Sequence, residues 1–236
     1  MNHSVNWKKF NSVILISTIL TACGDRNSNK DEFIFHNGTT YSTVKSPYTG
    51  RVWLDRNLGA ARVCESFNDT ACYGDYYQWG RNFDGHQDTT SSTTITQATN
   101  INNVGTDFIV NNFIPYDWTS IDNTGASRSK NWSKVDGTSI CPVQFRVPTL
   151  KELKQETLDN GVTNSNSAFA NFLKIPTGGG RSNDGTMSSV GTRGSMHTSS
   201  VGDSHSHQYI IFDSNYAKGS SDGAHAVGRL VRCIKH

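Results

Sequence analysis

Two stretches decide the fold of this chain: Cys141-Pro-Val-Gln-Phe-Arg-Val-Pro-Thr-Leu-Lys-Glu-Leu153 and Val231-Arg-Cys-Ile234. The first places a cysteine shortly before a helix start. Thr149 and Glu152 have the spacing of a capping box, in which each side chain satisfies a free backbone N–H of the new helix. The second stretch places another cysteine in an apolar run that is typical of a strand. The pattern indicates a disulfide between the first helix of a compact domain and its closing strand, and so an exported binding scaffold rather than a cytosolic enzyme.

The N-terminus independently indicates export. Lys8 and Lys9 precede an apolar run over residues 13–20, which is too short to span a bilayer as a helix. The run ends in Leu20-Thr-Ala-Cys23, which resembles the lipobox of bacterial lipoproteins. An ordinary signal peptide with a stray cysteine, or an internal apolar strand, is the alternative. We expect a signal peptide over residues 1–22, a tether over 23–31 lipidated at Cys23, and one domain over 32–236. The localisation expected is the outer membrane or cell surface, through a lipid anchor.

The chain has five cysteines, an awkward number for an exported protein. If Cys23 carries lipid, Cys64, Cys72, Cys141 and Cys233 remain, and three connectivities are open. Proximity favours Cys64 with Cys72, which leaves Cys141 with Cys233. Closing that loop of about ninety residues would stabilise the fold by roughly 4–5 kcal/mol on the chain-entropy model. A zinc site made of the four thiols is the weaker alternative, because the sequence contains no Cys-x-x-Cys pair.

Charge and composition narrow the class of protein. Lys8 and Lys9 account for the whole formal charge of +2, so the chain beyond the leader carries equal numbers of basic and acidic side chains. Nucleic-acid binding needs clustered Lys and Arg, and we therefore expect no nucleic-acid partner. Hydrophobic residues make up only 34% of the chain. This composition suits a loop-rich domain with a modest core held by disulfides.

Local patterns predict an α+β fold with mainly antiparallel strands and two short helices in a loop-rich middle. Asn37-Gly38 predicts a hairpin turn, and the aromatic run over 73–80 is interpreted as core packing. Trp118 and Trp132 are also interpreted as core residues in preference to ligand contacts. The expected elements are strands over 33–35, 39–44 and 51–54, a surface loop over 84–106, a helix from Thr149 to about Asn160, a second helix around 168–173 that ends before Pro176, and strands over 208–212 and 227–234.

Several ordered blocks carry a family resemblance: Trp53-Leu-Asp-Arg-Asn-Leu58, Cys72-Tyr-Gly-Asp-Tyr-Tyr-Gln-Trp-Gly80, Cys141 to Thr149, and Val231-Arg-Cys233. Together they resemble the Fibrobacter succinogenes major paralogous domain family, over roughly residues 40–236. That family is similar to C-type-lectin-like domains. The resemblance implies a C-type-lectin-like mixed fold, a disulfide that clamps the termini, and long loops that display a binding surface. This chain departs from the family pattern at Met196 and His197, where relatives tend to carry Trp before Ser-Ser.

In its C-terminal stretch the family also resembles the variable proteins of diversity-generating retroelements, in which loop side chains are randomised on a fixed frame. The resemblance implies that residues 195–225 display a polar surface for a glycan, protein or matrix ligand outside the cell. The expected ligand-binding residues are Ser195, His197, Ser204, His205, His207, Asn215, Tyr216, Ser221, Asp222 and His225.

The sequence contains only weak signals for functions other than ligand binding. His205-Ser-His207 has metal-site spacing in a strand, but no carboxylate spacing reinforces it, and solvent-facing loop residues are the favoured interpretation. The oxygen-ligand motifs of calcium-dependent lectins are absent from the sequence, as is a Gly-x-Ser-x-Gly elbow. We therefore expect no catalytic residue, metal or cofactor. An envelope enzyme acting on polysaccharide and a purely structural envelope component are the two alternatives.

Overall fold

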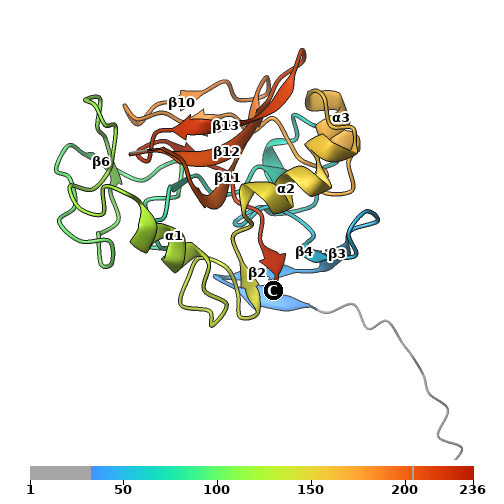
Figure 1. Ribbon diagram of the computed structural model, residues 1–236, viewed down its shortest axis with the longest axis horizontal. Coiled ribbons are helices and arrows are strands. Elements are labelled where there is room, and N and C mark those ends of the chain that lie inside the picture. Colours follow the sequence, from blue (N-terminus) through green and yellow to red (C-terminus); the bar gives the residue numbers. More distant parts are fainter. Residues whose placement is uncertain (1–32, 204) are drawn as a thin grey trace, which may run out of the picture. The chain divides into compact units, whose positions relative to one another are not determined.

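Short antiparallel strands and a few short helices build the described part of the chain, residues 33–203 and 205–236 of a computed structural model (Figure 1). The described residues belong to one compact unit. The expected signal peptide and the lipidated Cys23 lie outside the described residues, as does Ser204. Within the described ranges, no helix is both long and apolar enough to cross a membrane. The α+β class with mainly antiparallel pairing is confirmed.

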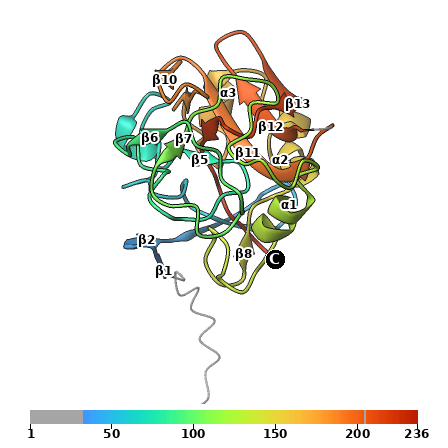
Figure 2. The same cartoon turned by 90° about the vertical axis from the view of Figure 1, so that its left-hand side faces the viewer.

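The hairpin predicted at Asn37-Gly38 is present. β1 (Ile34–His36) pairs with β2 (Thr39–Tyr41), and both turn residues have positive φ, as a type I′ turn requires. Next, β3 (Thr43–Lys45) pairs with β4 (Val52–Leu54), which is the strand expected over 51–54. A second small pair, β6 (Thr93–Thr94) with β7 (Phe108–Ile109), is parallel, and β6 lies inside the surface loop expected over 84–106 (Figure 2). His86 and Gln87 in that stretch are buried, so the expectation of a surface loop is wrong at those residues.

The two ends of the domain meet in one four-stranded sheet of order β3-β4-β15-β8. In it β15 (Ile234–Lys235) pairs with β4 on one side and with β8 (Phe145–Arg146) on the other. A disulfide joins Cys141, which lies shortly before β8, to Cys233, which lies directly before β15. A second disulfide joins Cys64 to Cys72. This is the pairing that proximity favours. The first bridge therefore connects two neighbouring strands, and the helix that follows Cys141 is the second helix of the described chain rather than the first.

That helix, α2 (Leu150–Glu156), has the predicted capping box of Thr149 and Glu152. It is followed by a 3-10 turn, η2 (Leu158–Asn160), and Gly161 ends the segment in a left-handed conformation. The helix lies against β11 (Gly194–Val201) and β12 (His207–Phe212), two strands of the sheet β11-β12-β13 (Figures 1 and 2). The hydroxyl of Ser200 accepts the backbone N–H of Leu150 at 3.0 Å, which fastens the helix start to β11. The second predicted helix is α3 (Ser165–Ala170), capped by Asn164.

Besides several strands of two residues and a 3-10 turn, three longer elements escaped the sequence prediction: α1 (Ala126–Trp132), β11 and β13 (Ala217–Gly223). The buried face of α1 is largely polar, with Arg128 and Asn131 beside Trp132, so no apolar period marks it. Strand β11 is buried on both faces over most of its length and consists largely of small polar residues, so it shows neither alternation nor an apolar run. Strand β13 is an edge strand rich in Gly and Ser, a composition typical of loops.

The single closing strand expected over 227–234 is wrong. The run is two short strands in different sheets, β14 (Gly228–Arg229) and β15. β14 lies between β9 (Gly180–Arg181) and β5 (Tyr77–Gln78), in a sheet that ends with β10 (Met187–Ser188). Between β14 and β15, Leu230 forms an isolated bridge with Met196 of β11. The run is buried because it passes through the core from one sheet to another, which an apolar pattern does not distinguish from one strand.

Candidate functional site

The structure buries four of the residues expected to face a ligand. His197, His207 and His225 are fully buried, and Ser195 is 6% exposed. The expectation of a displayed histidine surface is therefore wrong, because these rings fill the interior between β11, β12 and the segment before β14. Trp118 and Trp132 are also fully buried, so the core interpretation of both tryptophans is confirmed.

Trp79 is the centre of this buried cluster. The rings of His207 and His225 stack on it with centroids at 5.2 and 4.7 Å. Nδ1 of His225 lies 2.6 Å from a carboxylate oxygen of Asp117, and the guanidinium of Arg128 donates to both oxygens of Asp117 at 2.7 and 2.9 Å. Burial alone would raise the pKa of Asp117, but the hydrogen bonds from His225 and Arg128 outweigh it and hold the pKa below its usual value. The cluster is a structural network of paired charges rather than an accessible site.

Hydrogen bonding fixes the tautomers of His197 and His207. Burial lowers the pKa of both imidazoles well below the usual value, so both are neutral at pH 7. Nε2 of His197 lies 2.9 Å from the carbonyl oxygen of Tyr77, which can only accept, so this nitrogen carries the proton. Its Nδ1 is then an acceptor, and Nε2 of His207, 2.9 Å away, must donate to it. In the described ranges no group of three or more His, Cys, Asp and Glu side chains is arranged to hold a metal ion.

The other expected ligand residues reach the surface but do not form one site. Asn215 and Tyr216 form the turn between β12 and β13, where Asp213 accepts the backbone N–H groups of both. Ser221 and Asp222 lie at the opposite end of β13, which is about 20 Å away at 3.3 Å per residue. His205 is partly buried in the connection between β11 and β12. These residues therefore lie near the two ends of the edge strand β13.

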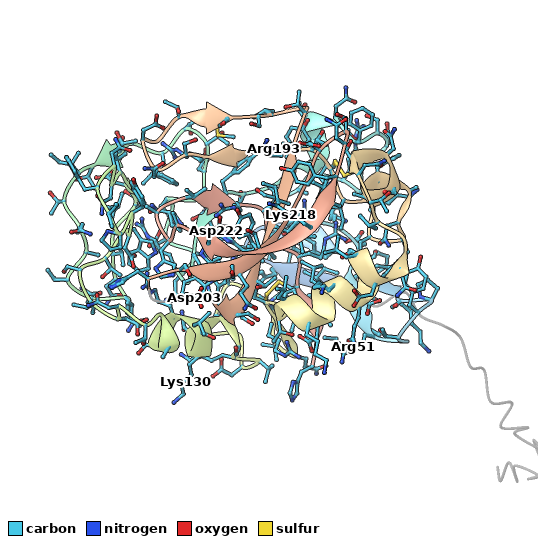
Figure 3. The ribbon with its side chains drawn as sticks, turned by 45° about the horizontal axis from the view of Figure 1, so that its top comes forward. Arg51, Lys130, Arg193, Asp203, Lys218 and Asp222 are labelled. Atoms are coloured by element: carbon cyan, nitrogen blue, oxygen red, sulfur yellow. A yellow bond between two sulfur atoms is a disulfide. The ribbon has the colours of Figure 1, made fainter. Side chains whose placement is uncertain are left out.

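A cleft of 170 Å³ lies where the β10-β9-β14-β5 sheet meets the β11-β12-β13 sheet. The β9–β10 hairpin forms one wall, and Ile211 of β12 and Val227 contribute apolar surface. Two guanidinium groups, those of Arg193 and Arg229, are its only charged lining side chains among the described residues. In Figure 3 Arg193 lies between the β9–β10 hairpin and the sheet that carries Lys218 and Asp222. The complete lining is Gly179, Gly180, Ser182, Ser188, Ser189, Arg193, Ser195, Ile211, Val227 and Arg229.

The glycine-rich run before β9 shapes this cleft. Gly179 has a φ of +68°, and a Cβ atom there would lie 2.2 Å from the carbonyl oxygen of Ser188. Its backbone N–H donates to the carbonyl of Arg193 at 2.7 Å, which ties the hairpin to the start of β11. The close approach of these backbones therefore requires glycine at this position.

Arg229 is held at the inner side of the cleft with little help from acceptors. It is 8% exposed, and its guanidinium lies 4.0 Å from the ring centroid of Tyr209. Its Nη1 is 3.5 Å from Nε2 of His207, but the tautomers derived above make that nitrogen a donor, so the contact is not a hydrogen bond. Burial lowers the pKa of Arg229, which the Tyr209 hydroxyl and the charge of Asp222 partly offset. A cation in this position favours an anion in the cleft.

Of the expected ligand-binding residues that the structure describes, Ser195 alone lines the cleft. The sequence contains one signal for the rest: Arg229 and Arg232 stand inside the apolar run over 227–234, where a charged side chain is costly to bury, and of the two Arg229 lines the cleft. Arg193 and the glycine-rich run before β9 come together with Arg229 only in the folded chain, so no local sequence pattern predicts that they line one cleft.

Comparison with protein-family models, with curated proteins and with solved structures finds no match to this chain.

Proposed function

We propose that this protein is a cell-envelope lipoprotein whose domain recognises an extracellular or envelope ligand, with the cleft between the two sheets as its binding site. The observation that carries the proposal is the cleft itself: an opening lined by glycines, serines and two arginines at the junction of two sheets. Concave sites with a few convergent polar groups on a rigid frame are the usual form of small-ligand sites.

The frame supports recognition by a preformed site. Two disulfides and a buried bidentate arginine–aspartate pair stabilise the domain, and the hairpin tied through Gly179 forms one wall of the cleft. A rigid site loses little conformational entropy when the ligand binds. The finer proposal is that the fold is C-type-lectin-like, of the Fibrobacter succinogenes major paralogous domain family. The two ends of β13 are then the positions that a diversity-generating retroelement would vary.

A polysaccharide and glycoprotein array, scored both for retention and for released reducing ends, tests the function. Retention without release is the expected result, and turnover would instead favour an envelope enzyme. Ser188→Trp places a large side chain at the exposed rim of the cleft and should abolish retention. Ser127→Trp, the same change on the exposed surface of α1, is the control and should leave retention intact. Equal retention by both variants would place the binding site elsewhere.

The anchor is tested separately. Replacing Cys23 with Ser should release the protein from membrane fractions into the soluble fraction, because the lipid can no longer be attached. Continued association with the membrane would refute the lipid anchor without affecting the proposed binding site.

A further inference from the structure

Arg229 is an exception among the buried arginines of the described chain. Arg81 pairs with Asp84, and Arg128 pairs with two aspartates. Arg181 donates four hydrogen bonds to neutral oxygens, and Arg232 donates two. Arg229 has only Tyr209, through its ring and hydroxyl, and no carboxylate of residues 33–203 or 205–236 lies within ion-pair distance of it. A guanidinium has five N–H donors, and beyond the Tyr209 hydroxyl no oxygen of the described residues accepts a hydrogen bond from Arg229.

The unused donors belong to a side chain that lines the cleft. Burying a cation without acceptors is strongly unfavourable, and every other buried arginine described donates to carboxylate or neutral oxygens. Nor does the neighbouring histidine relieve it, because Nε2 of His207 donates to His197. A ligand oxyanion in the cleft would supply the missing acceptor through charge-assisted hydrogen bonds.

Arg193 adds a second cation at the same cleft. Its side chain is 45% exposed, and its one ion pair, with Asp213, is loose at 3.9 Å. The guanidinium is therefore available to turn toward a bound anion at small cost, since exposed pairs contribute little stability. Asp222, whose charge acts on Arg229, accepts hydrogen bonds from Tyr209 and Ser220 and does not line the cleft.

The rest of the lining favours a sugar as the carrier of the anion. Ser182, Ser188 and Ser189 offer hydroxyls, whereas Ile211 and Val227 offer apolar surface, a combination that matches the hydroxyls and C–H groups of a pyranose. The volume of 170 Å³ is below the roughly 300–1,000 Å³ of pockets for drug-sized ligands, so the cleft has room for one small residue rather than a large molecule. The planar arginine fork suits a planar carboxylate.

We propose that the cleft binds a uronic-acid residue of an acidic glycan, with its carboxylate held between Arg229 and Arg193. This inference rests on the proposed recognition function and names the ligand class of the same site.

Titration calorimetry of the full chain in detergent, at low salt, tests it. The probes are oligomers of galacturonate, glucuronate and alginate, each paired with its methyl ester, which keeps the sugar and removes the charge. At least one acid should bind at least tenfold more tightly than its ester. Arg193→Gln should weaken binding of that acid about tenfold or more and leave the ester unaffected. Lys218→Gln removes an exposed charge on β13 outside the cleft and is the matched control, with an expected change below twofold.

Arg229→Lys keeps the charge but loses the planar fork, and should weaken binding of the acid while circular dichroism shows an intact fold. If that variant does not fold, the esters and Arg193→Gln still decide the question. The proposal is overturned if every acid binds no better than its ester, or if Lys218→Gln weakens binding as much as Arg193→Gln. It is also overturned if inorganic phosphate or sulfate competes as strongly as the uronate itself. Retention of neutral glycans on the array would leave the recognition function standing in each case, whereas the absence of any retention would refute the function as well.

Discussion

Replacing Asp117 with Asn should be among the most destabilising single changes in this protein. The Asp117 carboxylate is 2% exposed and accepts from Arg128 at 2.7 and 2.9 Å and from His225 at 2.6 Å. The asparagine amide has nearly the same shape but no charge, so it leaves a fully buried guanidinium with a weaker partner. Breaking a buried ion pair in this way typically costs about 3–5 kcal/mol.

The structure places the expected cost at the lower end of that range. Asp122, whose side chain is 9% exposed, also pairs with Nε of Arg128, at 3.2 Å, and would retain part of the compensation. We therefore expect a loss of about 3 kcal/mol, a large share of the roughly 5–15 kcal/mol by which domains are stable. Guanidinium-induced unfolding under non-reducing conditions, at pH 7, measures it.

A double-mutant cycle separates the ion pair from general damage. Arg128→Met removes the cation, so adding Asp117→Asn to it should cost much less than Asp117→Asn alone. The control is Asp136→Asn, an exposed carboxylate whose hydrogen bonds are local to Thr138, with an expected change within about 0.5 kcal/mol. A loss below 1 kcal/mol for Asp117→Asn, or strict additivity with Arg128→Met, would refute the argument that charge pairing stabilises this core.

Three further perturbations test the frame. Cys141→Ser and Cys233→Ser should each lower the free energy of unfolding by about 2–5 kcal/mol, and the double variant should be hardly less stable than either single variant; additive losses in denaturant titrations would contradict the pairing. Burial raises the pKa of Asp75 to about 6, so the folded state holds this proton more tightly than the unfolded chain and loses stability as pH rises from about 4 to above 6. Asp75→Asn should therefore stabilise the protein at pH 8 by up to about 3 kcal/mol and have little effect on stability at pH 4. An equal effect at both pH values would exclude the raised pKa of Asp75 as the cause. Gly179→Ala should lower the melting temperature clearly more than Gly191→Ala does. Both glycines have positive φ, but of the two only Gly179 has a carbonyl oxygen 2.2 Å from the added Cβ. Equal losses in thermal melts would show that this close approach does not affect stability.

Features encoded by neighbouring residues could be predicted from the sequence. The Asn37-Gly38 turn and the capping box of Thr149 and Glu152 depend on local hydrogen bonds and backbone conformation, and both are present. The cysteine pairing could also be anticipated, because few combinations were open. The physics in these cases is short-range, and the sequence spacing alone carries it.

The burial of polar residues could not be predicted from the sequence. The resemblance to variable lectin-like proteins implies a displayed surface over residues 195–225, which includes the histidines at 197, 207 and 225. The structure buries them because Trp79 provides a stacking surface and Asp117 and the Tyr77 carbonyl provide hydrogen bonds. All of these partners are distant in sequence, so no local window contains the reason for the burial.

The segment from Val227 to Cys233 links the disulfide-stabilised frame to the cleft. Val227 and Arg229 line the cleft, Leu230 pairs with Met196 of β11, and two residues after Val231 the chain reaches the disulfide at Cys233. The positions of the buried guanidinium and of the bridge are thus set by one short run of backbone, which is bonded in turn to three sheets. Binding by a preformed site requires that its charged group has few alternative positions, since ordering it on binding would weaken the affinity. The disulfide at Cys233 therefore restricts the segment that carries Arg229 as well as stabilising the domain.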